Sequence, residues 1–264
     1  MNIVVFAKQV PDTAAVKIDP VTNTLVRSGV PNIMNPFDRQ ALETALLLKD
    51  VHGATVTVVS MGPPQAEEIL KEALAMGADE AVLISDRALA GSDTLATSFA
   101  LAAAVKKIGV CDLVLCGKQA IDGDTAQVGP EVAEHLDLPQ VTGALKVVKE
   151  GDLLLVDRDN ETSSQTISVK LPALVTVTRA EKEPRFASIK GKMKAKKYAV
   201  PVWSAADLSL AEETIGLSGS PTKVERIFTP PVHEIENEII SEDDPAKAVE
   251  LLFEKLVQAK IIVR

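Results

Sequence analysis

Residues 117–130, GKQAIDGDTAQVGP, form a polar stretch that directly follows the apolar run DLVLCG. After a buried strand, such a stretch predicts a turn into a helix whose first backbone N–H groups lack partners within the helix. Those N–H groups attract a phosphate. We expect the hydroxyl of Thr125 and the amides of residues 126–128 to bind it, and Gly123 to supply an unusual backbone conformation.

The two carboxylates of this stretch, Asp122 and Asp124, suit a helix cap or ribose hydroxyls better than a phosphate, because like charges repel. The stretch lacks the spacing of a P-loop and that of the common dinucleotide fingerprint. Glycine and aspartate are also ordinary turn residues, so a capped turn without a ligand stays an open alternative.

Residues elsewhere that could act as catalytic groups stand alone. His52, His135 and His233 are isolated, and no serine or cysteine nucleophile lies in a recognisable context. Cys111 and Cys116 lie in or beside one apolar run, with neither a disulfide framework nor metal-ligand spacing, so we expect no metal site. The sequence therefore favours a protein that holds a ligand whose own chemistry does the work, rather than a hydrolase.

The elements that must position the polar stretch are strands that alternate with helices. The strand-like runs are NIVVFAK, ATVTVVS, EAVLIS and DLVLCG. Such alternation predicts right-handed βαβ units and a parallel sheet covered on both faces. Ligands of such sheets bind beyond the carboxyl ends of the strands. The loops after Val5, Ser60 and Leu115 are therefore the expected binding loops.

Several residues predict where the helices begin and end. Asn35 is the expected N-cap of a helix that continues through Pro36 and Asp38. Gly77 is the expected end of the next helix, and Ser92 or Asp93 the cap of a third.

The pattern changes from about residue 141. Residues 151–180 predict two strands joined by a polar hairpin turn and a strand broken at Pro172, which together suggest an antiparallel extension of the sheet. Residues 182–198 form a lysine-rich loop with interleaved apolar residues. The last part of the chain predicts an amphipathic helix that opens at residues 242–245, and its leucines need either a partner subunit or the chain's own core to cover them.

Composition limits the classes of partner. The chain has 264 residues, 46% of them hydrophobic, and a formal net charge of −9, which disfavours a nucleic-acid partner for the whole chain. No run approaches the ~18 apolar residues that a membrane span needs, and the N-terminus lacks the regions of a signal peptide. We therefore expect no membrane span and a cytoplasmic location.

Five segments resemble, in order and with plain spacing, the small (beta) subunit of electron-transfer flavoproteins: NIVVFAKQVPD, NIMNPFDRQALETALLLKD, VVSMGPPQAEEILKEALAMGADEAVLI, DLVLCGKQAIDGDTAQVGPEVAEHLDLPQV and EPRFASIKGKMKAKKY. The resemblance implies a doubly wound, mostly parallel, Rossmann-like α/β fold with an antiparallel extension and a C-terminal arm. It also implies a heterodimer with a larger alpha subunit that carries FAD, while the beta subunit binds an adenine nucleotide.

The motif match carries a set of nucleotide-binding residues onto this chain, and none of them is catalytic. They are Phe6, Ala7, Lys8, Val10, Asp12, Asn35, Phe37, Asp38, Met61, Gly62, Asp93, Thr94, Thr97, Gly117, Lys118, Gln119, Ala120, Asp122, Gly123, Asp124, Thr125, Ala126, Gln127 and Val128.

The identity of the nucleotide divides the family into two branches. KQVPDT, GSDTLATS and IDGDTAQVGP look like the electron-bifurcating branch, in which the beta subunit holds FAD and takes a hydride from NADH. Gln9 to Thr13 would then lie near the flavin or nicotinamide ring. The ordinary branch holds structural AMP instead, and KQVPDT would then only lead into a hairpin. Outside the family, a stand-alone ATP-binding regulator is the alternative.

The resemblance also implies partners and domains. Residues 1–200 would form the nucleotide-binding domain, with a partner-recognition loop at 182–198 whose Ile189 docks an acyl-CoA dehydrogenase. Residues 201–264 would form an arm that packs on the alpha subunit. The bifurcating branch would add a low-potential acceptor such as ferredoxin or flavodoxin.

Overall fold

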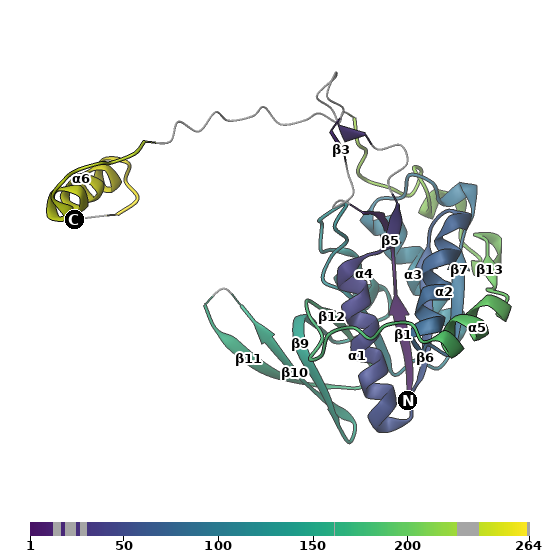
Figure 1. Ribbon diagram of the computed structural model, residues 1–264. Coiled ribbons are helices and arrows are strands. Elements are labelled where there is room, and N and C mark those ends of the chain that lie inside the picture. Colours follow the sequence, from purple (N-terminus) through teal and green to yellow (C-terminus); the bar gives the residue numbers. More distant parts are fainter. Residues whose placement is uncertain (13–16, 19–24, 27–30, 161, 226–237, 263–264) are drawn as a thin grey trace. The chain divides into compact units, whose positions relative to one another are not determined.

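The computed structural model in Figure 1 describes residues 1–12, 17–18, 25–26, 31–160, 162–225 and 238–262. The chain divides into two compact units, Met1–Lys223 and Val224–Arg264. Residues 201–223 therefore belong to the same unit as the sheet. Among the described residues, no helix is both long and apolar enough to cross a membrane.

The strands are β1 (Asn2–Phe6), β2 (Gln9–Pro11), β3 (Lys17–Ile18), β4 (Leu25–Val26), β5 (Asn32–Met34), β6 (Thr55–Met61), β7 (Glu80–Ile84), β8 (Leu113–Gly117), β9 (Gln140–Glu150), β10 (Leu153–Asp159), β11 (Ser164–Lys170), β12 (Ala173–Val177) and β13 (Val202–Trp203). The helices are α1 (Pro36–His52), α2 (Glu67–Met76), α3 (Thr94–Ile108), α4 (Val128–His135), α5 (Ile189–Lys197) and α6 (Pro245–Gln258). Short 3₁₀ helices cover Pro64–Ala66, Arg87–Leu89, Ala206–Leu208 and Glu212–Thr214.

One large sheet organises the first unit, with strand order β11-β10-β9-β12-β8-β1-β6-β7-β13. Every pair from β9 to β13 in that order is parallel. Because β6 lies on one side of β1 and β8 on the other, the direction of winding reverses between β1 and β8. This is the doubly wound arrangement expected from the alternating strands and helices, and ligands of such sheets bind at that reversal.

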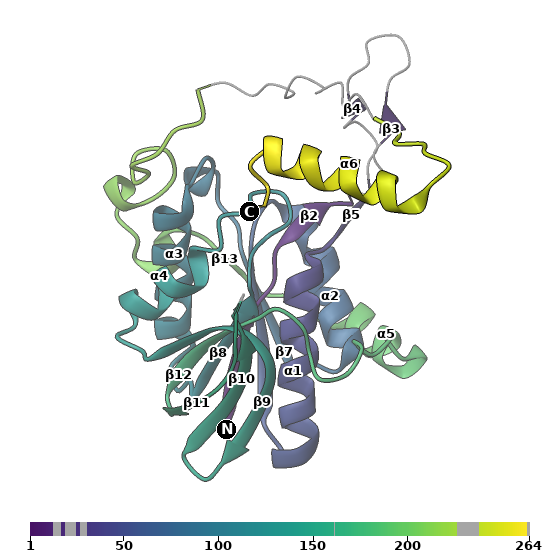
Figure 2. The ribbon, with the colours of Figure 1, turned by 90° about the vertical axis from the view of Figure 1, so that its left-hand side faces the viewer.

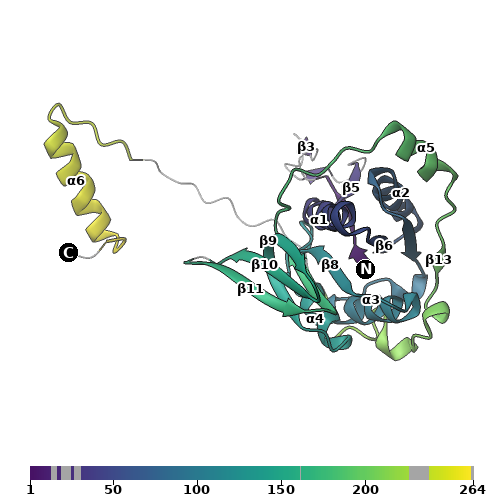
Figure 3. The same cartoon turned by 90° about the horizontal axis from the view of Figure 1, so that it is seen from below.

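Helices cover both faces of the sheet. Residues Ile3 and Val5 of β1 pack in one core cluster with α1 and α2, and Val4 and Phe6 pack in the other with α3 and α4. Figures 2 and 3 show these two helix layers on opposite sides of the strands. Burial on both faces explains why the strand sequences are continuous apolar runs rather than alternating ones.

The predicted helix ends are largely confirmed. Asp93 is the N-cap of α3, where its side chain accepts a hydrogen bond from the amide of Ala96, and Gly77 follows the last residue of α2. Asn35 occupies the N-cap position of α1, but its side chain makes no capping hydrogen bond to that helix. That side chain is used elsewhere, in the candidate site.

The antiparallel extension is confirmed for the predicted hairpin, β10 and β11, and β9, which was not predicted, also pairs antiparallel with β10. The strand after Pro172 does not belong to it, which corrects the expectation for residues 151–180. This strand, β12, lies between β8 and β9 and is parallel to both. All five of its residues are buried, as the interior of a parallel sheet requires. Pro172 precedes the strand and therefore does not break it.

The lysine-rich segment 182–198 is not simply a loop, because residues 189–197 form the helix α5. The chain reaches α5 by crossing α1. The amide of Ala180 donates to Gln40 Oε1 at 2.9 Å, and the amide of Arg185 donates to Glu43 Oε2 at 2.9 Å. The guanidinium of Arg185 also pairs with Glu43 and Asp50. These bonds to α1 fix the position from which α5 starts.

In the second unit, Asp244 caps α6 by accepting a hydrogen bond from the amide of Ala246. The start of this helix agrees with the expectation at residues 242–245. The helix has no buried side chain, and Val249, Leu252 and Phe253 are exposed. His233 lies outside the described residues.

The anchoring of Arg185 to α1 predicts a stability difference between two ion pairs. The side chain of Glu43 is 3% exposed, so Arg185→Ala leaves a buried carboxylate without its guanidinium. We expect this change to lower the free energy of unfolding by about 2–4 kcal/mol, somewhat less than for a fully buried pair because the Arg185 side chain is itself partly exposed.

The matched control is Lys146→Ala, which breaks an exposed pair with Glu181 and should cost less than about 1 kcal/mol. Urea unfolding of both variants measures the difference. Equal losses would show that the Arg185 pair is no more than a surface ion pair.

Candidate functional site

A pocket of about 860 Å³ lies beyond the carboxyl ends of four strands of the first unit. Its lining comes from the ends of β1, β6, β7 and β8 and the segments that follow them, from Asp38 of α1, from the N-terminal half of α3 and from the start of α4. The volume is in the upper part of the ~300–1,000 Å³ range of small-molecule sites. The predicted binding loops after Val5, Ser60 and Leu115 all contribute to this pocket.

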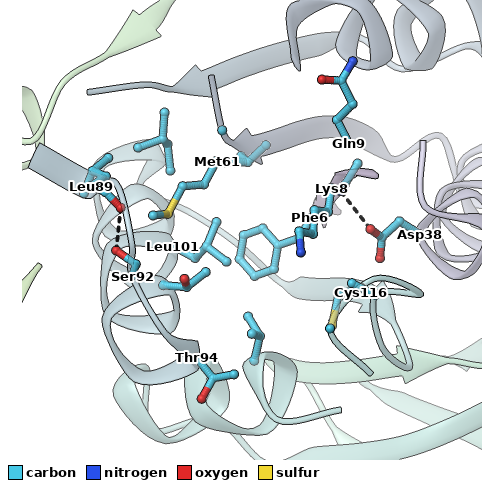
Figure 4. A pocket seen from close by; sticks show the side chains of 18 of the residues that line it. Phe6, Lys8, Gln9, Asp38, Met61, Leu89, Ser92, Thr94, Leu101 and Cys116 are labelled. Carbon is cyan, nitrogen blue, oxygen red and sulfur yellow. Dashed lines mark hydrogen bonds between the residues drawn. The ribbon is translucent and has the colours of Figure 1, made fainter. Parts of the chain in front are cut away.

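One side of the pocket is apolar. In Figure 4 the apolar side chains of Phe6, Met61, Leu89 and Leu101 gather on that side, with the hydroxyls of Ser92 and Thr94 beside them, and Lys8 and Asp38 lie on the other. The apolar group comes from β1, β6, the Arg87–Leu89 turn and α3. An apolar surface of this kind suits a planar aromatic ring, whereas the other side presents polar groups and backbone amides.

Asn35 positions the polar loop between β8 and α4. Its side-chain Nδ2 donates to the carbonyl of Gln119 at 2.8 Å, and the amide of Ile121 donates to Asn35 Oδ1 at 3.2 Å. The Asn35 side chain is fully buried, so both of its polar atoms need these partners. Asn35 therefore binds the loop that lines the pocket instead of capping its own helix.

Asp38 joins the two loops that meet at the winding reversal. Its Oδ2 accepts a hydrogen bond from the amide of Lys8, after β1, and its Oδ1 accepts one from the amide of Gly117, at the end of β8, both at 2.8 Å. A Cβ at Gly117 would lie 2.6 Å from the carbonyl carbon of Phe37, so glycine is needed for this close approach. Burial raises the pKa of Asp38 to about 6, although the two amides oppose that effect.

The carboxylates of the 117–128 loop bind within the protein. Lys8 Nζ pairs with Asp122 at 2.7 Å, which links the loop after β1 to the loop after β8. The side chain of Gln119 donates to Asp124. Neither aspartate lines the pocket.

The unusual backbone of this loop lies at other residues than expected. Asp124 and Ala126 both have φ of 56°, whereas Gly123 does not have a positive φ. Aspartate tolerates this left-handed conformation, and an alanine there carries some strain. The prediction for Gly123 was therefore wrong. Thr125 and residues 126–128 line the pocket, at the N-terminus of α4.

Most of the sequence-predicted site residues line this pocket. They are Phe6, Ala7, Lys8, Asp38, Met61, Gly62, Asp93, Thr94, Thr97, Gly117, Lys118, Gln119, Ala120, Gly123, Thr125, Ala126, Gln127 and Val128. Val10, Asp12, Asn35, Phe37, Asp122 and Asp124 are not in the lining. Gln9 lines the pocket, Val10 is buried in the pairing of β2 with β5, and Thr13 lies outside the described residues.

One wall of the pocket, formed by residues 85–91 after β7, was not predicted from the sequence. The signal was present, because EAVLIS is an apolar strand run followed by the polar, glycine-containing DRALAG. Strand β7 ends at the same edge of the sheet as β1, β6 and β8. Cys116 also lines the pocket, and burial raises the pKa of its thiol far above the usual range, so it stays protonated.

The burial of Asp38 predicts a pH dependence of stability. Its pKa is about 6 in the folded state and 3.8 as the reference value, so the folded chain binds the proton more tightly. This contribution to stability is full below about pH 4 and is lost as the pH rises through 6. Asp38→Asn removes it, so the wild-type minus variant difference in unfolding free energy should decrease from pH 4 to pH 7 in urea titrations. A difference that does not change with pH would contradict the raised pKa.

The sequence of this chain is similar to those of known proteins of one family. The model of the electron transfer flavoprotein domain matches residues 22–208. The electron transfer flavoprotein subunit beta of Megasphaera elsdenii is 52% identical over 270 residues, covering 99% of this chain and 100% of that protein. The subunit beta of Clostridium acetobutylicum is 55% identical over 229 residues, covering 87% and 88%.

A third relative, subunit CarD of the caffeyl-CoA reductase-Etf complex of Acetobacterium woodii, is 51% identical over 232 residues and covers 88% of each chain. The relatives match over nearly the whole length, and the matched region contains the loops after β6, β7 and β8 that line the pocket. These similarities, together with the doubly wound sheet, show that the chain belongs to the electron transfer flavoprotein family as a subunit beta.

Proposed function

We propose that this chain binds FAD in the pocket and accepts a hydride from NADH, as the beta subunit of an electron-bifurcating heterodimer with a larger alpha subunit. The observation that carries the proposal is the extent of the pocket. It reaches from the α4 N-terminus and the 117–128 loop to the apolar side formed by Phe6, Met61, Leu89 and Leu101.

The two sides of the pocket fit the two parts of FAD. The amides of residues 126–128 and the hydroxyl of Thr125 suit a diphosphate, and the apolar side suits a tricyclic ring. When bound, FAD supplies the hydride and single-electron chemistry, so the chain needs only to orient it and to limit the access of water. This agrees with the isolated histidines and the absence of a recognisable nucleophile in the sequence.

AMP is the alternative ligand, because the family also has an ordinary branch. Its single phosphate, ribose and adenine would use the 117–128 loop in the same way. AMP lacks a tricyclic ring, so it would leave much of the apolar side uncovered, which costs hydrophobic free energy. FAD would cover that side and is therefore the favoured ligand. The stand-alone ATP-binding regulator is not retained, since the family match extends over nearly the whole chain.

Partners follow from the same proposal. Electrons would pass to a low-potential acceptor such as ferredoxin or flavodoxin and, through the FAD of the alpha subunit, to an acyl-CoA dehydrogenase. The arm, residues 201–264 in the sequence-based division, would pack on the alpha subunit through residues such as Leu252 and Phe253 of α6, which are exposed. The heterodimer would act in the cytoplasm.

Ile189 is the proposed anchor of the acyl-CoA dehydrogenase contact. It is 82% exposed at the first position of α5, and exposed Phe186 and Met193 lie near it in the sequence. Ser188 caps this helix, and Ala195 is buried in the main core, so the helix presents Ile189 from a fixed backbone. The lysines of α5 would form a charged rim that steers encounter.

The proposed ligand predicts the cofactor content of the heterodimer. The chain purified together with its alpha subunit should contain two FAD molecules and no AMP, measured from the flavin absorption and from the nucleotides released by denaturation. Anaerobic NADH should bleach one of the two flavins rapidly. One flavin and one AMP per heterodimer, with no reaction to NADH, would assign the chain to the ordinary branch.

The proposed anchor predicts a selective loss of electron transfer. Ile189→Ala should lower kcat/KM for the dehydrogenase about tenfold or more, because an apolar anchor in a partner pocket carries a large share of binding energy. Flavin content should not change. Val110→Ala is the matched control, since Val110 is 74% exposed and lies between α3 and β8. Loss of flavin in the Ile189 variant would instead indicate a structural role.

A further inference from the structure

The pocket wall formed by residues 85–93 is held from behind by a later part of the chain. The amide of Ser85 donates to the carbonyl of Trp203 at 3.0 Å, and the amide of Ala205 donates to Asp86 Oδ2 at 3.1 Å. Farther along, residues 214–222 lie along the same wall, and we call them the strap. They are the last part of the first unit before Val224.

The first contacts of the strap are at Gly216. Its amide donates to Ser92 Oγ at 3.1 Å, and Ser92 Oγ donates in turn to the carbonyl of Leu89 at 2.8 Å. Gly216 has φ of 57°, and a Cβ there would collide with the carbonyl oxygen of Ala88. The backbone of the strap therefore lies directly against the turn that supplies Leu89 to the pocket.

The second contacts are at Ser220 and Thr222, which both bind Asp93. The amide of Asp93 donates to Ser220 Oγ at 2.8 Å, and Ser220 Oγ donates to the carbonyl of Gly216 at 2.6 Å. Both the amide and the hydroxyl of Thr222 donate to Asp93 Oδ2, at 3.0 and 2.8 Å. The other oxygen of Asp93 caps α3. One aspartate thus joins the strap to the N-terminus of the helix.

The N-terminus of α3 is a pocket surface. Thr94, Thr97 and Leu101 of this helix line the pocket, together with most residues of the wall at 85–93. Short turns with few buried apolar contacts open locally at low free-energy cost. A ligand that needs the closed wall loses apparent affinity in proportion to the fraction of molecules in which the wall is open.

We propose that the strap holds this wall in the ligand-binding arrangement, and that Ser220 and Thr222 are positioning residues for the bound nucleotide. The inference rests on the proposed function in that it requires a nucleotide in the pocket, either FAD or AMP. Neither side chain is in the pocket lining, so their effect must pass through Asp93 and the wall.

The test uses the full chain in its heterodimer, with the nucleotide of this chain removed and with Ser220→Ala and Thr222→Val combined. Two readouts are measured. Hydrogen exchange of residues 85–97 without added ligand should become faster in the variant. The dissociation constants of FAD and, separately, of AMP are then measured, and the constant of the ligand that binds should rise about tenfold, a typical size for coupling through a shared element.

Two further variants separate the strap contacts from general damage. Ser218 lies in the same segment, is exposed, and its hydroxyl has no hydrogen-bond partner among the described residues, so Ser218→Ala should behave as wild type. Thr222→Ser keeps the hydroxyl donor to Asp93 and should retain wild-type affinity and exchange.

The outcomes distinguish this inference from the proposed function. Wild type that binds AMP but not FAD overturns the proposed ligand, and the strap then predicts the tenfold loss for AMP. Faster exchange in the double variant with unchanged affinity overturns the strap, and so does unchanged exchange. Equal loss of affinity in Ser218→Ala overturns it as well. A wild-type heterodimer that binds neither nucleotide overturns both proposals.

Discussion

Two buried polar side chains at the start of α1 hold together the edge of the sheet on which the pocket depends. The side chain of Asn35 donates to a backbone carbonyl of the loop after β8 and accepts a hydrogen bond from a backbone amide of the same loop. Asp38 accepts hydrogen bonds from the amides of Lys8 and Gly117, which lie just after β1 and at the end of β8, the two strands between which the winding reverses. A doubly wound sheet leaves a crevice at this point, and the loops around it lie beyond the hydrogen-bond ladder of the large sheet. Side chains at the start of α1 supply hydrogen-bond partners to these loops and so hold the crevice together.

The same helix also fixes the segment that leads to the proposed docking residue. Gln40 accepts a hydrogen bond from the amide of Ala180, and Glu43 accepts hydrogen bonds from both the amide and the guanidinium of Arg185. The loops of the pocket and the start of α5 are therefore both held by hydrogen bonds from one 17-residue helix and its N-cap. Because Glu43 is buried, its carboxylate is tolerated only with these hydrogen bonds, which makes the register of the crossing segment specific. A change in α1 would therefore alter both the pocket loops and the segment that leads to α5.

Features with local signals could be predicted from the sequence. The apolar strand runs, the cap at Asp93 and the glycine after α2 depend on residues a few positions apart, and each was found. The place of β12 in the sheet, the wall after β7 and the partners of Asn35 depend on which distant segments meet. The positive φ at Asp124 and Ala126 was missed for a different reason, because glycine is the usual residue there and Gly123 lies next to them. The resemblance to a family identified most pocket residues, because residues that bind the same ligand in the family come from segments far apart in the sequence.

A crystal structure of the heterodimer purified with its own ligands tests the central claim most directly, namely that the crevice held by Asn35 and Asp38 is built for a dinucleotide. The account predicts two phosphates at the amides of residues 126–128 and a tricyclic ring against Phe6 and Leu101. A single phosphate at those amides with the apolar side of the pocket uncovered, or a nucleotide bound elsewhere on the chain, would contradict it.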